Sequence, residues 1–270
     1  DTVWSTHLIS PHLKPGGCIL AAMNGLPDEM VAGVVGWSRT MGCVATISAG
    51  MYRPGHVVRT DAKAHAFTVG ELHGLVTPRA REVAALLDAV GPSDATANIW
   101  GARWAKMVWN CMTNAVAGLL GDVHLDAAQR RLRDRVEAAL GHEAATVAAG
   151  LGVALEPVLG IAPERFHEAN TPKGLTALTA LVGEVHDARG LTAEQAARLP
   201  APGRPSLLQD VLKGRRTEVR QLNGHVEAEG RRIGVPTPLN SAVILAMDEL
   251  AAGRARPGID NLVRLAALVG

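Results

Sequence analysis

The chain of 270 residues is long enough for one large domain or two ordinary ones, and its 47% apolar content is typical of a globular protein. Aromatic residues make up only 3% and the net charge is +1, which argues against a nucleic-acid-binding surface. No apolar run reaches the roughly 18–20 residues of a membrane span. The three separated cysteines, Cys18, Cys43 and Cys111, fit the reducing cytoplasm.

The first third of the chain alternates between helical and strand-like segments. Apolar spacing predicts helices over residues 3–13, 28–36 and 77–91, the last with a proline near its start and a glycine at its end. The apolar run 16–26 lies between Gly-Gly and Asn-Gly and predicts a buried strand. The β-rich runs within 42–72 are split by Arg-Pro-Gly and Thr-Asp-Ala-Lys, which predicts antiparallel strands.

From about Asn98 onward the pattern is helical throughout. An α/β part followed by an all-helical part predicts two domains, over residues 1–97 and 98–270. The expected helices of the second part cover residues 99–120, 126–150, 163–169, 172–188, 192–198, 206–232, 238–252 and 258–269.

Lys106, Asn110 and Asn114 lie four residues apart within an otherwise apolar helical segment. At about 100° per residue they fall within roughly an 80° stripe of one helix face. A lone lysine there could simply extend its ammonium to water along an apolar stem. Two aligned asparagines need a further explanation, since a buried amide without partners costs about 1–3 kcal/mol. The row therefore indicates the polar wall of a binding cleft.

A second polar row begins at Ser206. With Gln209 three residues later, Ser206 has the pattern of a helix capping box, which does not exclude a second role. Asp210 and Glu218 are eight residues apart, about 80° on a helical wheel if the helix is continuous. On the pattern alone, Glu218 could equally be a solvated residue paired with a neighbouring arginine.

Several motifs of catalytic chemistry are absent from the sequence. His142 and Glu143 lack the second histidine of a zinc-protease motif, because Thr146 occupies that position. No cysteine pair has zinc-ligand spacing, and neither a phosphate-binding loop of the G-x-x-x-x-G-K-[ST] type nor a G-x-S-x-G elbow occurs. We therefore expect no metal site.

Taken together and in order, "NGL" at 24–26, Trp100 through "KMVWNCMTN", "PSLLQDVLKGRRTEVRQLNG" and "GVPTPLN" closely resemble the ketopantoate reductase (2-dehydropantoate 2-reductase) family. The resemblance implies a Rossmann nucleotide-binding domain followed by a helical domain of the 6-phosphogluconate-dehydrogenase-like type. It also implies NADPH-dependent reduction of 2-dehydropantoate to pantoate, on the route to pantothenate and coenzyme A. The implied partner is a small 2-oxo acid, with neither nucleic acid nor membrane, and a homodimer stays open.

Four residues match the family's catalytic and substrate-binding positions. Lys106 resembles the catalytic lysine, and an ammonium suits the negative charge that hydride delivery creates on a carbonyl oxygen. Asn110 resembles a substrate-binding amide, and Asn114 resembles the polar contact one turn later. Ser206 resembles the group that holds the substrate carboxylate.

Three further residues match positions near the cofactor. Glu218 resembles the acidic residue close to the cofactor ribose and the lysine. Asn24 resembles the asparagine that touches nicotinamide ribose and substrate. Met51 falls where some relatives contact the cofactor through the backbone.

One departure is the absence of the family's first β-α-β unit, whose G-x-G-x-x-G loop normally binds the pyrophosphate. We therefore expect a longer parent protein. Two alternatives stay open. One is a related NADPH-dependent reductase of another 2-oxo acid, and the other is a non-catalytic module that has lost the nucleotide loop.

Overall fold

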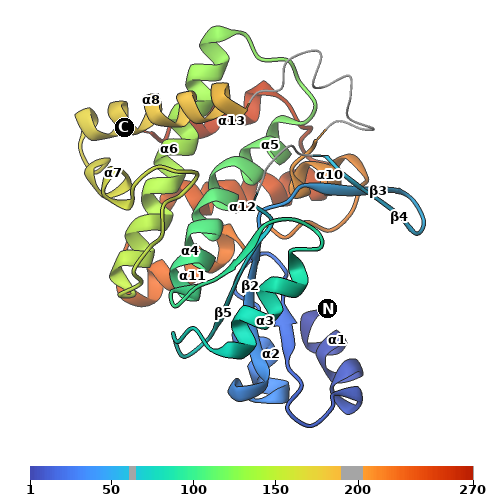
Figure 1. The fold of residues 1–270 in the computed structure, drawn as a ribbon. Helices are drawn as coiled ribbons and strands as arrows, with labels where there is room; N and C mark the ends of the chain where they lie inside the picture. The colour runs from blue at the N-terminus through green and yellow to red at the C-terminus, as the bar shows by residue number, and fades with distance from the viewer. Residues whose placement is uncertain (61–64, 190–202, 270) are drawn as a thin grey trace. The chain divides into compact units, whose positions relative to one another are not determined.

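The computed structural model describes residues 1–60, 65–189 and 203–269 (Figure 1). The chain forms two compact units, residues 1–106 and residues 107–270. Helix α4 (Ile99–Trp109) contributes residues to both units, with Lys106 as the last residue of the first.

The first unit is an α/β structure with a mixed sheet in the order β1-β2-β5-β6. Strand β2 pairs in parallel with β1 and antiparallel with β5, β5 pairs in parallel with β6, and β3 and β4 form a separate antiparallel hairpin. The expected helices and antiparallel strands of this part are confirmed. The buried strand expected within 16–26 is the short edge strand Ile19–Ala21, of which only Ala21 is fully buried. Its elements before α4 are α1 (Thr2–Ile9), η1 (Ser10–His12), β1 (Ile19–Ala21), α2 (Asp28–Val35), η2 (Trp37–Arg39), β2 (Thr40–Ala45), β3 (Ala49–Arg53), β4 (His56–Arg59), β5 (Phe67–Glu71), α3 (Pro78–Leu87) and β6 (Ser93–Ala95).

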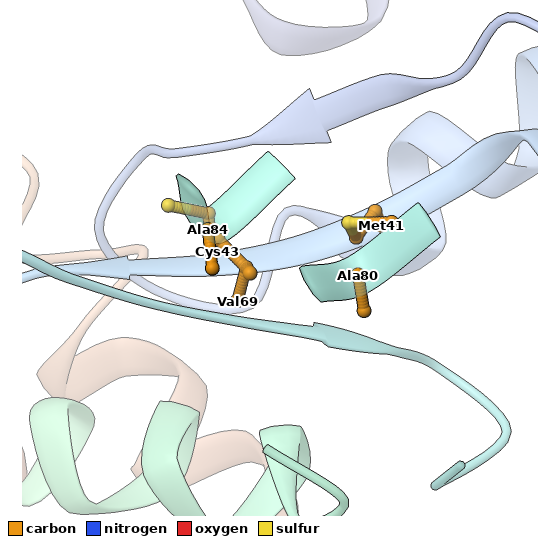
Figure 2. Close-up of a cluster of buried hydrophobic side chains, with 5 residues drawn as sticks. All are labelled: Met41, Cys43, Val69, Ala80 and Ala84. Carbon is orange, nitrogen blue, oxygen red and sulfur yellow. The ribbon is translucent and has the colours of Figure 1, made fainter. Parts of the chain in front are cut away.

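Helix α3 covers one face of this sheet. Figure 2 shows the small core between them, in which Met41 and Cys43 of β2 and Val69 of β5 meet Ala80 and Ala84 of α3. Alanines on the helix allow its backbone to approach the strands closely, so side chains of the central strands fill the layer. The residues of β2 that alternate with this set point to the other face.

The other face of the sheet receives the first residue of α4. Gly42 and Gly70 are register partners on β2 and β5. A Cβ added at Gly42 would lie 2.5 Å from Cγ1 of Ile99, and one added at Gly70 would lie 2.8 Å from Ile99 Cβ. The two glycines therefore leave the gap that Ile99 fills, and they fix the beginning of α4 on the sheet.

The second unit is helical throughout the part that the structure describes, apart from an isolated bridge between Val158 and Ile161. Its long helix α6 begins at a complete capping box formed by Asp126 and Gln129. The elements are η3 (Asn110–Asn114), α5 (Ala115–Leu120), α6 (Ala127–Gly150), α7 (Pro163–Glu168), α8 (Pro172–Arg189), α10 (Ser206–Leu212), α11 (Asn223–Ile233), α12 (Pro238–Ala251) and α13 (Ile259–Ala266).

The helices expected near 99–120, 126–150, 163–169, 172–188, 238–252 and 258–269 are confirmed, with small differences at their ends. The one expected over 192–198 lies outside the described residues. The single helix expected over 206–232 is wrong, because α10 ends at Leu212 and α11 begins at Asn223. Gly214 has a φ of +62°, which lies outside the right-handed helical region and turns the chain away from the helix axis. Consequently the helical-wheel relation between Asp210 and Glu218 does not apply.

No helix in the described part of the chain combines the length and the apolar content that a membrane span requires.

Candidate active site

The polar row of the sequence lies on two consecutive helical segments, with Lys106 on α4 and both Asn110 and Asn114 on η3. Lys106 is half-buried in the last turn of α4. The following segment, Asn110–Asn114, is a π-helix, whose hydrogen bonds run from residue i to residue i+5. The sequence analysis missed this feature, since no residue type marks it. A wider turn brings residues four apart closer to one line, and such segments frequently occur at functional sites.

Asn110 and Asn114 are both buried and lie in direct contact. Nδ2 of Asn114 donates to Oδ1 of Asn110 over 3.1 Å and to Oγ of Ser206 over 3.2 Å. The exposed fractions of the two asparagines are 1% and 9%. The structure therefore brings three of the expected site residues, Asn110, Asn114 and Ser206, together within the second unit.

Asn110 Nδ2 is buried and has no hydrogen-bond partner among the described residues. Leaving a buried amide donor unsatisfied costs about 1–3 kcal/mol. Such groups are uncommon in native proteins, and a bound ligand is one way to satisfy them. Within this cluster, the amide nitrogen of Asn110 is the donor whose hydrogen-bonding capacity the described residues leave unused.

Ser206 is not the helix cap that the sequence pattern predicts. The N-cap position of α10 belongs to Pro205, without a side-chain cap, and Ser206 is the first helical residue. Gln209 donates from Nε2 to the carbonyl of Arg204 over 2.9 Å instead of completing a capping box. Since α10 contacts α5 and η3, the hydroxyl oxygen of Ser206 accepts a hydrogen bond from Asn114 rather than from a backbone amide of its own helix.

Glu218 lies between α10 and α11, half-buried, in a turn that begins the approach to α11. Its carbonyl oxygen accepts hydrogen bonds from the backbone amides of Gln221 and Leu222. The backbone of Glu218 is therefore held by a local turn rather than by a continuous helix.

Two expected site residues belong to the first unit, as does Lys106. Asn24 is half-buried in the loop after β1, where Gly25 has a φ of +81° and permits the tight turn. Met51 lies on β3 of the hairpin, with 58% of its surface exposed. A backbone contact, as expected for Met51, does not require its side chain to be buried.

The first unit contains a buried ion pair that the sequence analysis did not predict. Arg103 of α4 and Asp28 of α2 are 3% and 0% exposed, and Nη2 of Arg103 lies 2.8 Å from Oδ1 of Asp28. Burial raises the pKa of Asp28, while the charge and hydrogen bond of Arg103 act to lower it. The available signal was an arginine among apolar residues, three positions before Lys106.

The π-helical segment is supported by a chain of buried polar groups. Nδ2 of Asn223 donates to the carbonyl of Cys111 over 3.3 Å and to Oδ1 of Asn240 over 2.9 Å. Asn240 in turn donates from Nδ2 to Glu143 over 2.8 Å, and burial raises the pKa of Glu143. Because these groups come from α6, α11 and α12, several helices fix the segment that carries Asn110.

One group in the described residues has the composition of a metal site: Asp134 and Glu137 of α6 with His186 of α8. Nε2 of His186 lies 2.6 Å from Oε2 of Glu137, which is a hydrogen-bond distance. Arg133 makes two hydrogen bonds to Oδ1 of Asp134, over 3.0 and 2.7 Å. The guanidinium already neutralises that carboxylate, so the geometry is that of an ion-pair cluster.

A Rossmann-like α/β unit is thus followed by a helical unit that contains a buried amide cluster. Residues 98–251 match the family model described as ketopantoate reductase PanE/ApbA C terminal, so the protein belongs to the ketopantoate reductase family.

Individual relatives agree with this assignment. The chain is 26% identical over 230 residues to a 2-dehydropantoate 2-reductase of Archaeoglobus fulgidus, a match that covers 84% of this chain and 66% of that protein. The solved 2-dehydropantoate 2-reductase from Geobacter metallireducens is 24% identical, with a TM-score of 0.66, over 94% of this chain and 74% of that one. D-mandelate dehydrogenase with NADH and anilino(oxo)acetate is 19% identical, with a TM-score of 0.69, over 93% and 73%. At these identities the two solved structures establish the fold.

Proposed function

We propose that the protein is an NADPH-dependent reductase of 2-oxo acids and that 2-dehydropantoate is its substrate. Membership of the ketopantoate reductase family supports the reaction class. The observation that carries the proposal is the orphaned Nδ2 of Asn110, buried beside Asn114 and Ser206 and one helical turn after Lys106. A substrate oxygen would satisfy that amide.

Lys106 is the proposed proton donor. Reduction of a ketone places negative charge on the carbonyl oxygen, and a nearby ammonium stabilises that charge and supplies the proton. The half-buried position of Lys106 supports this role, because a partly desolvated ammonium interacts more strongly with a developing oxyanion than a fully hydrated one does.

Asn110, Asn114 and Ser206 are the proposed substrate-binding residues. The oxygen of Ser206 accepts a hydrogen bond from Asn114, which turns the hydroxyl hydrogen away from Asn114 and toward another acceptor. A substrate carboxylate is such an acceptor. Asn110 Nδ2 provides a second donor, so the cluster is suited to an oxygen-rich acid rather than to a cation.

Asn24, Met51 and Glu218 are the proposed contacts to NADPH, which supplies the hydride when bound. Asn24 fits this role because it follows the carboxyl end of β1, a strand that pairs in parallel with β2. Ligands of α/β sheets bind beyond the carboxyl ends of such strands. In this proposal residues 1–97 belong to the nucleotide-binding domain and residues 98–270 to the substrate domain, with Lys106 and Glu218 as the two catalytic residues.

A related 2-oxo acid is the second candidate substrate. The ternary structure of the neighbour D-mandelate dehydrogenase contains NADH and anilino(oxo)acetate, which carries a carbonyl beside a carboxylate as 2-dehydropantoate does. The donors of Asn110 and Ser206 would recognise that shared group, and they do not select the rest of the molecule.

A turnover test with the protein from its complete reading frame separates these substrates. NADPH or NADH is supplied with 2-dehydropantoate and with aromatic and branched 2-oxo acids, and consumption of the reduced nicotinamide is followed. We expect the highest kcat/KM for 2-dehydropantoate with NADPH. A higher value for another 2-oxo acid would assign the second candidate, and no turnover with any of them would refute the reductase.

A further inference from the structure

We propose that Arg103 is a positioning residue that fixes the Asn24 loop relative to Lys106. The inference rests on the proposed roles of Lys106 and Asn24, and it concerns residues of the first unit alone. Arg103 and Lys106 are three positions apart on α4, one turn of the helix. The guanidinium of Arg103 reaches from that helix to the loop that carries Asn24.

The contacts of Arg103 are concentrated at the carboxyl end of β1. Nη1 donates to the carbonyl of Met23 over 2.8 Å, and Nη2 donates to the carbonyl of Ala21 and to Asp28 Oδ1. Ala21 is the last residue of β1, and Asp28 begins α2. One guanidinium therefore holds the start, the middle and the end of the turn between the strand and the helix.

The contact with Met23 bears directly on Asn24. The carbonyl of Met23 and the backbone nitrogen of Asn24 belong to the same planar peptide, so fixing the carbonyl fixes the plane from which Asn24 departs. Lys106 follows Arg103 on a rigid helix. The Asn24 amide and the Lys106 ammonium are thus tied to each other through one side chain.

Arg103 is not needed to keep α4 on the sheet. Ile99 fills the gap left by Gly42 and Gly70, and Nε1 of Trp100 donates to the carbonyl of Leu72 over 3.0 Å. Loss of Arg103 should therefore leave the helix in place and release only the loop. This separation makes a positioning role distinguishable from a purely structural one.

The local energetics also point away from stability as the reason for the pair. Nε of Arg103 and Oδ2 of Asp28 are buried without hydrogen-bond partners in the described residues. Replacing a buried ion pair with apolar residues of similar size is often neutral or stabilising. A pair that stability does not require, beside a proposed proton donor, is consistent with a geometric role in the reaction.

The test uses three variants of the protein from its complete reading frame. They are a double variant that carries both Arg103→Met and Asp28→Leu, the single variant Arg103→Lys, and the control Arg39→Met. Arg39 donates to the carbonyls of Gly17 and Lys14 over 3.1 Å each, so it holds the chain before β1 as Arg103 holds the chain after it. Hydrogen exchange of residues 22–26 and steady-state kinetics are measured for each.

We expect the double variant to exchange faster at residues 22–26 and to lose about 10- to 100-fold in kcat, because small misplacements of reacting groups are costly. Arg103→Lys should show smaller changes in exchange and in kcat than the double variant, because it keeps the positive charge. It should still differ from the parent, since a single ammonium cannot reach all three acceptors as a guanidinium does. The control should retain both properties. If the double variant does not fold, the comparison of Arg103→Lys with Arg39→Met decides: only Arg103→Lys should change the exchange of residues 22–26 and kcat.

The positioning role of Arg103 would be overturned if the folded double variant showed unchanged hydrogen exchange at residues 22–26. It would equally be overturned if the kcat of that variant lay within about threefold of the parent value. Failure of the proposed function would look different. In that case the parent protein itself would not oxidise NADPH with a 2-oxo acid, or Lys106→Ala would be as active as the parent, whereas the exchange measurement would still report on the loop.

Discussion

At the scale of single residues, Asn110 is the position where we expect a substitution to reduce activity far more than stability. Its Nδ2 has no hydrogen-bond partner in the described residues, although its Oδ1 accepts from Asn114. A group that is costly to bury and has no partner among the described residues is expected where a ligand completes the site. Its removal should therefore cost activity more than stability.

Asn110→Leu replaces the orphaned amide with an apolar side chain of similar size. We expect only a small change in Tm, because loss of the unpaired-donor penalty offsets loss of the hydrogen bond from Asn114. Without the contact to substrate, kcat/KM for the 2-oxo acid should fall at least about tenfold. The matched control is Asn261→Leu. Nδ2 of Asn261 donates to the carbonyls of Leu119 and Arg256 over 3.0 and 2.9 Å, so this variant should lose stability. Equal destabilisation of the two variants would contradict the account.

Ser206 gives a second residue-scale prediction, because it lies at the start of α10 without capping it. Ser206→Asp places a negative charge at a helix N-terminus, which is favourable for the helix, and against a substrate carboxylate, which is not. We expect a Tm within a few degrees of the parent and the loss of most of kcat/KM.

The control for Ser206 is the true cap Asp126, whose side chain accepts from the amides of Ala128 and Gln129. Asp126→Ala should lower stability by about 1 kcal/mol and leave KM unchanged. Near-normal catalysis by Ser206→Asp would remove Ser206 from the substrate site.

At the scale of elements, the π-helical segment η3 depends on close packing against α6. A Cβ at Gly141 would lie 2.5 Å from Sδ of Met112 and 2.9 Å from Cε1 of Phe166. Gly141→Ala should therefore displace η3 and destabilise the second unit by about 1–3 kcal/mol, as overpacking does. Denaturant unfolding measures the change.

Gly118→Ala in α5 is the matched control for Gly141→Ala. The nearest atom to a Cβ at Gly118 is Cβ of Leu207 at 3.4 Å, an ordinary contact, so alanine should be neutral or stabilise the helix. If Gly141→Ala were as well tolerated as Gly118→Ala, the close approach of α6 would not determine the position of η3.

The same elements show how far the sequence reaches. The periodicity of residues 99–120 predicted both a helix and the aligned Asn110 and Asn114, because apolar spacing reports the buried face directly. It did not predict the π-helical turn, which no residue type in the segment marks and whose contacts with Gly141 and Asn223 come from distant parts of the chain. The break after α10 was not predicted because a single glycine such as Gly214 is tolerated inside a helical pattern, and only its φ of +62° shows that the helix ends there.

Long-range partners account for the other differences. Ser206 and Gln209 have the spacing of a capping box, but tertiary contacts with Asn114 and Arg204 take precedence over the local pattern. The apolar surroundings of Arg103 hint at burial, but its acceptors could not be predicted, because they lie about 80 residues earlier in the chain. The sequence therefore predicted most of the elements, and the structure was needed to find the break between α10 and α11 and to identify what holds the elements in position.

At the scale of the whole molecule, the two units should respond to pH through different carboxylates. Burial acts to raise the pKa of Glu71 in the first unit, but hydrogen bonds from Arg79 and Thr77 and the charge of Arg79 lower it overall. Its stabilising contribution is present above the ordinary carboxyl pKa and is lost as pH falls through the folded-state value. In the second unit, the raised pKa of Glu143 acts in the opposite sense, with stability lost as pH rises above the ordinary value.

We therefore expect acid to unfold the first unit with a slope that Glu71→Gln makes shallower. The glutamine variant should be less stable than the parent at neutral pH, because Arg79 loses its charged partner 2.6 Å away, and the difference should diminish in acid. Hydrogen exchange of β5 across a pH series measures this in the first unit alone. A constant difference between parent and variant at all pH values would contradict the assigned direction of the pKa shift.

The most direct test of the central claim is the rate of NADPH oxidation with 2-dehydropantoate, measured for the protein from its complete reading frame and for its Lys106→Ala variant. The account predicts substrate-dependent oxidation by the parent and a loss on the order of 100-fold or more in the variant, with an unchanged Tm, as expected when a general acid is removed. A folded variant within about threefold of the parent would contradict the role of Lys106, and a parent without turnover would contradict the proposed reaction.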